Sequence, residues 1–379
     1  MYFIQMTPSK ITQKQPSQQE DVPCYRDIAI PIAFPDNWAK GMRWRDRMLL
    51  KYKIIYTQFY RVGHAAILLI ERSTGVVLYY DYGRYITAPG RGRARSKETD
   101  PKLTIPIKAQ FDCDGTLSNL NEIMLFLETI QDATHGHGKT IYSVCHRFDF
   151  QKAVSYANKI IAKTSTRYTT FAFNGNNCSS YITNTLIAGC SDRMKKLKLS
   201  LPQTIAPTPL GNVVNASENG KIYELNQGVF SSYYMDRKKV FANIWRNISF
   251  SLFKNKHLEP TINQLALNGS TPKLDIPEGA QLLSSLGESS WFRLVKSNQC
   301  VENEYIIQSF TESGKLNYEI VSKLEKGSID PEQPYKFVFD CNRLITNILQ
   351  NNVKYSLYFQ REFNSNIPSD SYKSVSRNG

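Results

Sequence analysis

The sequence predicts an α+β protein with two domains. In the first domain, an antiparallel sheet packs on a helix that begins at a cysteine, and the second domain is small and all β. Three observations support this prediction: a hairpin of apolar strands over residues 64–82, a helical repeat that begins at Cys178, and short alternating runs from residue 276 onward. With 379 residues, the chain is long enough to bury both cores.

Composition places the chain among globular proteins, since 41% of its residues are hydrophobic and 12% are aromatic. No apolar run reaches transmembrane length, and the N-terminus lacks the layout of a signal peptide. We therefore expect a cytoplasmic protein, or one exported without a cleavable signal peptide. Seven cysteines without a repeating spacing favour reduced thiols. Residues 1–23 are rich in Gln, Ser, Thr, Lys and Pro, which predicts disorder before the first domain begins at residue 24.

The net charge of +14 favours an anionic surface as a partner, such as nucleic acid, anionic lipid or acidic polysaccharide. The alternative is an ordinary solvated basic face. No RRM, KH, helix-turn-helix or zinc-finger pattern accompanies the charge, so the sequence does not indicate a module for sequence-specific nucleic acid binding.

The hairpin carries the first candidate site residue. His64 begins one apolar strand, a Ser-Thr-Gly turn follows, and the chain returns over residues 76–82. In such a hairpin the residues opposite His64 lie close to Asp81, which makes Asp81 the candidate to orient the imidazole, with Tyr80 and Tyr82 behind it. The alternative for His64 is a purely structural role.

A Gly- and Arg-rich stretch without a clear period follows the hairpin up to about residue 103, and it predicts a long loop. Guanidinium groups match carboxylates and phosphates in bidentate geometry. The candidates to bind such a group on a substrate are Arg84, Arg91, Arg93 and Arg95. The alternative is pairing with acidic neighbours such as Glu98 and Asp100.

Two other groups are weaker candidates. The pair His135 and His137 lacks further ligands at zinc-like spacing, so it predicts a flexible turn and no metal site. Cys145 and His146 are adjacent on a predicted strand, where neighbouring side chains point to opposite faces and cannot act on each other. Asp149 is predicted to cap a helix that runs to about residue 163.

Residues 171–189 form an Asn- and Gly-rich loop followed by a short helix. Asn177 is suited to the N-cap, Gly189 to the stop, and apolar residues between them repeat at helical spacing. Cys178 then lies in the first turn, where the helix dipole favours a thiolate and free backbone N–H groups can hold an oxyanion. The alternative is a cysteine that simply belongs to the core.

The character of the chain changes after residue 190. Residues 191–275 are Pro-, Ser- and Asn-rich and predict a linker with one docking helix near residues 232–248. Residues 276–363 alternate in short runs and predict a small antiparallel domain with an accessory or recognition role. Residues 364–379 predict a disordered tail.

The motifs GHAAILLI and NNCSSYI, with the returning strand between them, resemble the circularly permuted branch of the NlpC-type papain-like superfamily. That branch includes the lecithin:retinol acyltransferase-like proteins, and its order is His, a polar residue on the next strand, then Cys on a helix. The stretches IAIPIAFPD, YDYGRY, GRGRARS, TDPKL and NGNNCSSYI resemble an uncharacterised bacterial domain family with this permuted core. The resemblance covers residues 27–189. The third catalytic position of the superfamily, which is often a polar residue, falls within YYDY here.

The resemblance implies a cysteine-dependent hydrolase or acyltransferase that acts on an amide or ester bond. His64 would activate Cys178, and Asp81 would hold the imidazole in the correct tautomer. The backbone N–H of Cys178 would stabilise the oxyanion, and the supporting candidates are Asn176, Asn177 and Tyr82. Such chemistry needs neither a metal nor an organic cofactor.

Related superfamily members act on cell-wall peptides or on lipids, so the implied substrates are peptide-, cell-wall- or lipid-derived acyl groups. The alternative is a non-catalytic papain-like scaffold, or an effector delivered to a neighbouring cell. It would use the Arg-rich stretch and the β domain to hold an anionic partner. The sequence does not indicate an oligomeric state.

Overall fold

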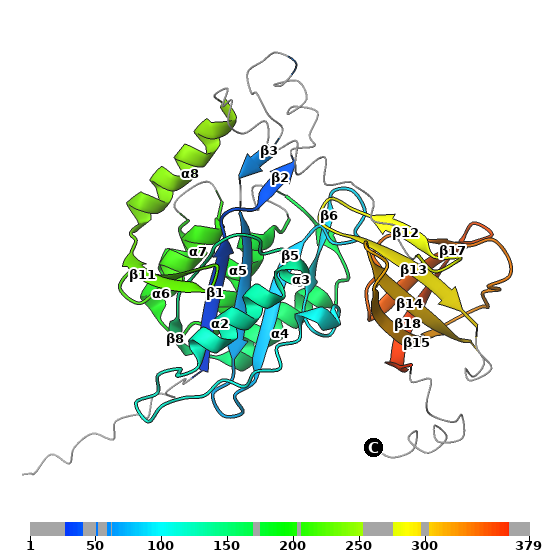
Figure 1. Cartoon of the computed structure of the whole chain (residues 1–379), viewed down its shortest axis with the longest axis horizontal. Coiled ribbons are helices and arrows are strands. Elements are labelled where there is room, and N and C mark those ends of the chain that lie inside the picture. The colour runs from blue at the N-terminus through cyan, green and yellow to red at the C-terminus, as the bar shows by residue number, and fades with distance from the viewer. Residues whose placement is uncertain are drawn as a thin grey trace, which may run out of the picture.

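The computed structural model describes residues 27–40, 51, 59–61, 63–169, 175–202, 206–252, 276–296 and 303–363. Within these residues, a nine-stranded sheet with helices on both faces forms one domain and a seven-stranded sheet forms another (Figure 1). The predicted α+β fold with a second, all-β domain is therefore confirmed. The ends for which disorder was predicted, residues 1–23 and 364–379, lie outside the described residues, as do residues 171–174 of the loop before Cys178.

The large sheet has the strand order β11-β10-β7-β1-β4-β5-β6-β9, and β8 also pairs with β1. Its strands are β1 (Asp27–Phe34), β4 (His64–Ile70), β5 (Val77–Gly83), β6 (Arg91–Arg95), β7 (Thr140–Tyr142), β8 (Cys145–Phe148), β9 (Thr166–Arg167), β10 (Lys221–Asn226) and β11 (Val229–Tyr234). A separate two-stranded sheet pairs β2 (Trp38–Lys40) with β3 (Phe59–Arg61). No helix in the described parts of the chain is both long and apolar enough to cross a membrane.

Helices cover both faces of the large sheet, which explains why β1 and β4 are almost continuously apolar. The helices α2 (Leu120–Thr129) and α3 (Gln131–Thr134) and the 3-10 helix η1 (Pro101–Leu103) follow β6 in sequence. Side chains of α2 share one core with alternate residues of β1 and β4. On the opposite face, α4 (Phe150–Ile161) and α5 (Cys178–Gly189) form a second core with the remaining alternate residues. Asp149 caps α4 as predicted, accepting a hydrogen bond from the N–H of Lys152.

The pairing of β4 with β5 sets the first two site residues side by side. Ala66 pairs directly with Asp81, so His64 lies two residues further along β4 on the same face of the sheet. His64 and Asp81 are therefore diagonal neighbours across the hairpin, close enough for long polar side chains to interact.

The Arg-rich stretch corrects the prediction of a loop, because residues 91–95 form strand β6. Arg91, Arg93 and Arg95 alternate with Gly92 and Ala94, and the strand pairs with β5 in a register that sets Arg95 opposite Asp81. The small residues leave room on the other face: a Cβ at Gly92 would lie 2.8 Å from the Tyr168 ring. Alternation with a period of two is the strand signal in this stretch.

The prediction of a linker over residues 191–275 is also corrected. The described part of this segment forms α6 (Arg193–Ser200), α7 (Pro209–Ala216), β10, β11 and α8 (Arg237–Leu252). Strand β10 pairs with β7 and so extends the large sheet. Apolar residues of α7, β10 and α8 close a third core around Ala33 and Ile141. The segment therefore belongs to the first domain up to residue 252, and residues 253–275 lie outside the described residues.

This assignment predicts that Ile222→Ala lowers the free energy of unfolding by about 2–5 kcal/mol, the usual cost of removing a fully buried isoleucine side chain. Ile222 is 0% exposed in β10, whereas Val229 on the neighbouring strand is 69% exposed and serves as the matched control. We expect Val229→Ala to change stability by less than about 0.5 kcal/mol in the same urea titration. Equal, small effects would mean that the hairpin is not part of the folded domain.

The second domain contains β12 (Gln281–Ser284), β13 (Ser289–Val295), β14 (Glu304–Thr311), β15 (Leu316–Leu324), β16 (Lys336–Phe337), β17 (Ile345–Gln350) and β18 (Val353–Glu362). Their order is β12-β13-β14-β15-β18-β17-β16. The two ends of this order meet, because the Gln281 side chain donates to the Tyr335 carbonyl at 3.0 Å and accepts from the Phe337 N–H at 3.0 Å. The sheet thus closes into a barrel-like shape around an apolar core.

Candidate functional site

The structure brings His64, Asp81 and Cys178 together from the beginning of β4, the middle of β5 and the first turn of α5. The Nε2 atom of His64 lies 3.3 Å from Oδ2 of Asp81. The His64 side chain also hydrogen-bonds to Cys178. Because Nε2 faces Asp81, the other ring nitrogen, Nδ1, is the one left for the sulfur.

The beginning of α5 fixes the position of the thiol. The Asn177 side chain accepts from the Ser180 N–H at 2.8 Å, and the Ser180 hydroxyl accepts from the Asn177 N–H at 2.8 Å, which together form a capping box. The sulfur of Cys178 accepts a hydrogen bond from the backbone of Ala65 and lies 3.8 Å from Oγ of Ser179. The thiol therefore sits at the positive end of a capped helix.

The supporting role predicted for the Asn177 side chain is corrected by this cap. Its oxygen is bonded to Ser180, and its Nδ2 donates to the Thr169 carbonyl at 3.1 Å. Asn176 lies next to it with a half-buried side chain, and its backbone pairs with residues 167 and 169. Asn177 thus positions Cys178 through the helix and does not offer its side chain to an oxyanion.

Electrostatics favour a charged pair between His64 and Cys178. Burial works against the imidazolium, but the hydrogen bonds to Asp81 and Cys178 outweigh it and raise the pKa of His64 to about 9. Burial likewise works against the thiolate, but the hydrogen bond and charge of His64 outweigh it and lower the pKa of Cys178. Both shifts therefore favour a thiolate beside an imidazolium over two neutral groups.

Asp81 is fully buried and holds its charge because of Arg95. The guanidinium binds both carboxylate oxygens, with Nε 2.9 Å from Oδ1 and Nη2 2.6 Å from Oδ2. The hydroxyls of Tyr79 and Tyr85 also donate to Oδ2, at 3.1 and 3.2 Å. Burial would raise the pKa of Asp81, but Arg95 and then His64 hold it well below its usual range. The carboxylate is thus fixed as an acceptor for His64.

The four arginines separate into two pairs. Arg93 and Arg95 are each 2% exposed, and Arg93 binds Asp100 through two hydrogen bonds of 2.6 and 2.8 Å. The prediction that they bind substrate is corrected, because buried guanidinium groups paired with carboxylates do not face solvent. The other two lie nearer solvent: Arg91 bonds to Ser165, and Arg84 lies over the Tyr168 ring at 5.1 Å.

The tyrosines behind Asp81 occupy the opposite face of β5. Tyr82 is fully buried, its hydroxyl contacts Oγ1 of Thr166 at 2.7 Å, and its ring stacks on Tyr168 at 6.0 Å. Tyr80 donates to Asn158 of α4 at 3.3 Å. Tyr82 therefore forms part of the core under the site, and the supporting role predicted for it is structural.

Tyr85 was not predicted from the sequence, yet its hydroxyl lies 3.2 Å from Nε2 of His64 and 3.2 Å from Oδ2 of Asp81. The sequence feature that could have indicated Tyr85 is the last tyrosine of YDYGRY, two residues after strand β5 ends at Gly83. It carries no periodicity, because the strand has ended, so pattern analysis gives it no partner.

Of the weaker candidates, Cys145 and His146 lie outside this group, whereas the His135 ring stacks on Tyr85 with the ring centroids 5.3 Å apart. In β8, Cys145 is buried whereas His146 is exposed, which agrees with their predicted opposite orientation. Among the described residues, no group of three or more His, Cys, Asp or Glu side chains is placed to hold a metal ion.

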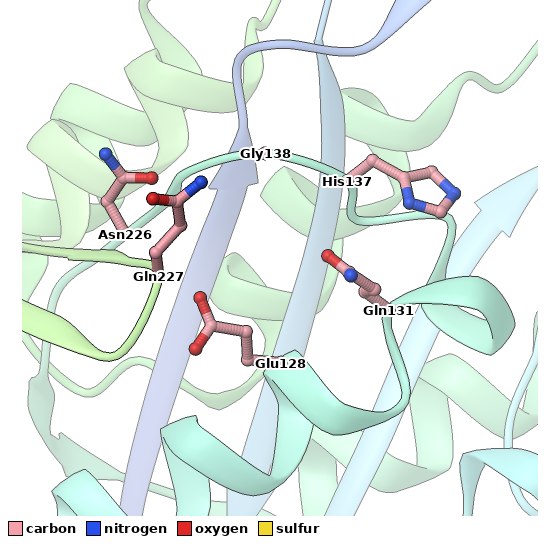
Figure 2. Close-up of a pocket in the computed structure, with 6 residues that line it drawn as sticks. All are labelled: Glu128, Gln131, His137, Gly138, Asn226 and Gln227. Atoms are coloured by element: carbon pink, nitrogen blue, oxygen red, sulfur yellow. The ribbon is translucent and has the colours of Figure 1, made fainter.

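A polar hollow of about 400 Å³ lies elsewhere, between the end of α2 and the β10–β11 turn (Figure 2). Figure 2 shows Glu128 pointing toward Gln227 while the His137 ring turns away from both. The hollow includes none of the three site residues and no nucleophile.

Comparison with known families matches both domains. Residues 29–195 match the family model described as "Type VI secretion system effector TseH-like", and residues 280–360 match the model of the "DUF6695 C-terminal domain". The first match shows that the first domain is similar to this effector family over residues 29–195. The first matched segment ends at residue 195 and the second begins at residue 280, so each lies within one of the two domains.

A crystal structure of the type VI secretion system effector TseH is similar to this chain with a TM-score of 0.35 and 16% sequence identity. The similarity covers 54% of this chain and 97% of that chain. No curated protein sequence gives a significant match.

Proposed function

We propose that the first domain is a cysteine-dependent hydrolase or acyltransferase that attacks an amide or ester bond through a Cys178 thiolate activated by His64. One observation carries the proposal: an imidazole that is only 12% exposed hydrogen-bonds to a carboxylate on one side and to a thiol at a helix N-terminus on the other. The order His64, Asp81, Cys178 along the chain supports the circularly permuted, lecithin:retinol acyltransferase-like branch of the papain-like superfamily.

In the proposed reaction the Cys178 thiolate adds to the carbonyl carbon of the substrate. The first N–H groups of a helix have no partner within the helix, and those of Ser180 and Tyr181 are bonded to Asn177. The N–H groups of Cys178 and Ser179 are therefore the donors nearest to the developing oxyanion.

The tetrahedral intermediate then collapses to a thioester as His64 gives its proton to the departing amine or alcohol. Asp81 holds the imidazole throughout. Attack by water on the thioester gives hydrolysis, and attack by a second substrate gives acyl transfer. Arg84, half-buried over Tyr168, is the arginine best placed to contact an anionic group on the substrate.

The match to effector proteins supports a second proposal, delivery of this protein into another cell. Delivery is compatible with catalysis and with a non-catalytic scaffold that holds an anionic partner. A scaffold has no chemical need for an imidazolium–thiolate pair, so the state of Cys178 separates the two possibilities.

The test is the pH dependence of Cys178 alkylation by iodoacetamide, followed for each cysteine by mass spectrometry, in wild type and His64→Ala. At pH 6 we expect wild-type Cys178 to react about 30- to 100-fold faster than in the variant, because an ordinary thiol with a pKa of about 8.5 is almost fully protonated there. This advantage shrinks as pH rises toward about 9, because the ordinary thiol of the variant then ionises as well.

Cys113, which is exposed, provides the internal reference thiol. Cys190 is a poor reference, because its hydrogen bond to Cys145 lowers its pKa to about 7. Identical pH profiles for Cys178 in the two proteins would contradict the proposed mechanism and favour the scaffold.

A further inference from the structure

Tyr85 lies where the two domains meet, and it is enclosed on all sides. Its ring is covered by the Arg95 guanidinium, whose Cζ lies 3.6 Å from the ring centroid, and it stacks on His135 at 5.3 Å. The residue is 3% exposed. Gly83 makes room for it, since a Cβ there would lie 2.4 Å from Cζ of Tyr85. The hydroxyl that touches His64 and Asp81 is therefore held by a closely packed ring.

The second domain fixes the backbone on both sides of Tyr85. The Ser285 hydroxyl donates to the Arg84 carbonyl at 2.6 Å and accepts from the Ile86 N–H at 2.9 Å. The Gly287 N–H also donates to the Arg84 carbonyl, at 3.1 Å, and the Asp340 N–H donates to the Ile86 carbonyl at 2.9 Å. In Figure 1 the second domain accordingly lies beside the end of β5 and β6.

The Ile86 side chain is part of the second domain's core, although the residue belongs to the first domain in sequence. Its φ of 51° lies in the left-handed region, which a β-branched residue adopts only when the surroundings enforce it. The strained backbone next to Tyr85 therefore depends on the second domain.

A charged contact reinforces this junction. Glu288 of the second domain lies 3.5 Å from Nη2 of Arg93, and Nε of Arg93 donates to the Tyr85 carbonyl at 2.9 Å. Five contacts around Tyr85 thus involve the second domain: the Ser285 bridge, the Gly287 and Asp340 hydrogen bonds, the burial of Ile86 and the Glu288–Arg93 pair.

We propose that the second domain is a positioning module for the candidate active site, and that Tyr85 is the positioning residue through which it acts. The inference rests on the proposed function. Burial holds Tyr85 protonated by raising its pKa well above the usual value, so its hydroxyl donates to Asp81 and its oxygen accepts from the Nε2–H of His64. With Nε2 held by two acceptors, the ring cannot rotate, and Nδ1 stays directed at the sulfur.

The experiment compares full-length variants by the alkylation profile of Cys178 and by the pKa of His64 from NMR titration. Tyr85→Phe removes only the hydroxyl, and we expect alkylation at pH 6 to slow about three- to tenfold, the usual effect of one lost hydrogen bond. The pKa of His64 falls in the same variant. Gly83→Ala displaces the ring and shifts both readouts in the same direction.

Ser285→Ala tests the role of the second domain without touching Tyr85. We expect smaller shifts of alkylation rate and His64 pKa in the same direction. Ser285→Thr, which keeps a hydroxyl, is expected to restore the wild-type values. Ser284→Ala is the matched control, because its exposed hydroxyl bonds to Ser289 within the second domain. It leaves both readouts unchanged.

The outcomes separate the two proposals. If wild-type Cys178 shows no reactivity at low pH, the proposed function and this inference fail together. If wild type is reactive and folded Tyr85→Phe keeps the same profile and the same pKa of His64, only the inference is overturned. If Tyr85→Phe shifts the profile but Ser285→Ala does not, Tyr85 positions His64 without help from the second domain. That result overturns the positioning role proposed for the second domain.

Discussion

Replacing Arg95 by methionine is expected to lower the free energy of unfolding by about 3–5 kcal/mol at pH 7, because it leaves the carboxylate of Asp81 buried without its cation. Asp81 is 0% exposed, and Arg95 supplies two of its shortest hydrogen bonds. Denaturation with urea measures the loss. Arg91→Met on the same strand is the control, since Arg91 is exposed and bonds to Ser165; we expect it to cost less than about 1.5 kcal/mol.

The pH dependence of this loss identifies its cause. In wild type the pKa of Asp81 is depressed in the folded state, so the ion pair contributes stability above the carboxyl's ordinary pKa, and this contribution is lost as pH falls through the lower folded value. In Arg95→Met, burial raises the pKa of Asp81 instead. The deficit is therefore largest at neutral pH and shrinks toward pH 4.

Adding Asp81→Asn to Arg95→Met is expected to recover part of the stability, because the buried charge is removed together with its partner. If the double variant is less stable than Arg95→Met by the full cost of a second independent substitution, the two residues do not form the proposed buried pair.

Cys178→Ala is expected to abolish turnover of whichever amide or ester substrate a screen identifies, and His64→Ala to lower kcat/KM by about 10²- to 10⁴-fold, as loss of a general base does. Wild-type activity declines at low pH as Cys178 is protonated, and it declines again as pH rises through about 9, where His64 loses its proton. Initial rates across pH 5–10 measure both limbs.

Cys113→Ala serves as the control for this experiment, because that thiol is exposed and lies in the turn before α2. Turnover that survives in Cys178→Ala but is lost in another cysteine variant would place the chemistry elsewhere in the chain.

The features predicted correctly from the sequence depend on contacts between residues close together in the chain. The hairpin that contains His64 and Asp81 is set by a short turn, and the start of α5 is set by the cap at Asn177. In each case the interacting residues lie within about twenty positions of each other, so a short stretch of sequence contains both partners.

The features that were missed depend on distant partners. The sequence predicts a linker where strand β10 lies, because its partner β7 is far upstream and its apolar residues pack into two separate cores. Ile222 packs with α7 and α8, and Leu225 packs with α2. For the arginines the sequence leaves open a substrate role and pairing with neighbours such as Asp100. Arg93 does pair with Asp100, whereas the partner of Arg95, Asp81, becomes evident only from the register of β5 and β6. Tyr85 acquires its surroundings from the second domain, about 200 residues later.

The Ser285 bridge to residues 84 and 86 also affects the order in which the protein is completed during synthesis. The partners are separated by 199 and 201 residues, so the Tyr85 segment emerges from the ribosome long before Ser285 exists. At about 5–20 residues per second, this interval lasts about 10–40 s. A nascent chain therefore contains Cys178 before Ser285 exists, and under the proposed positioning role the final arrangement around His64 forms only after the second domain has been synthesised.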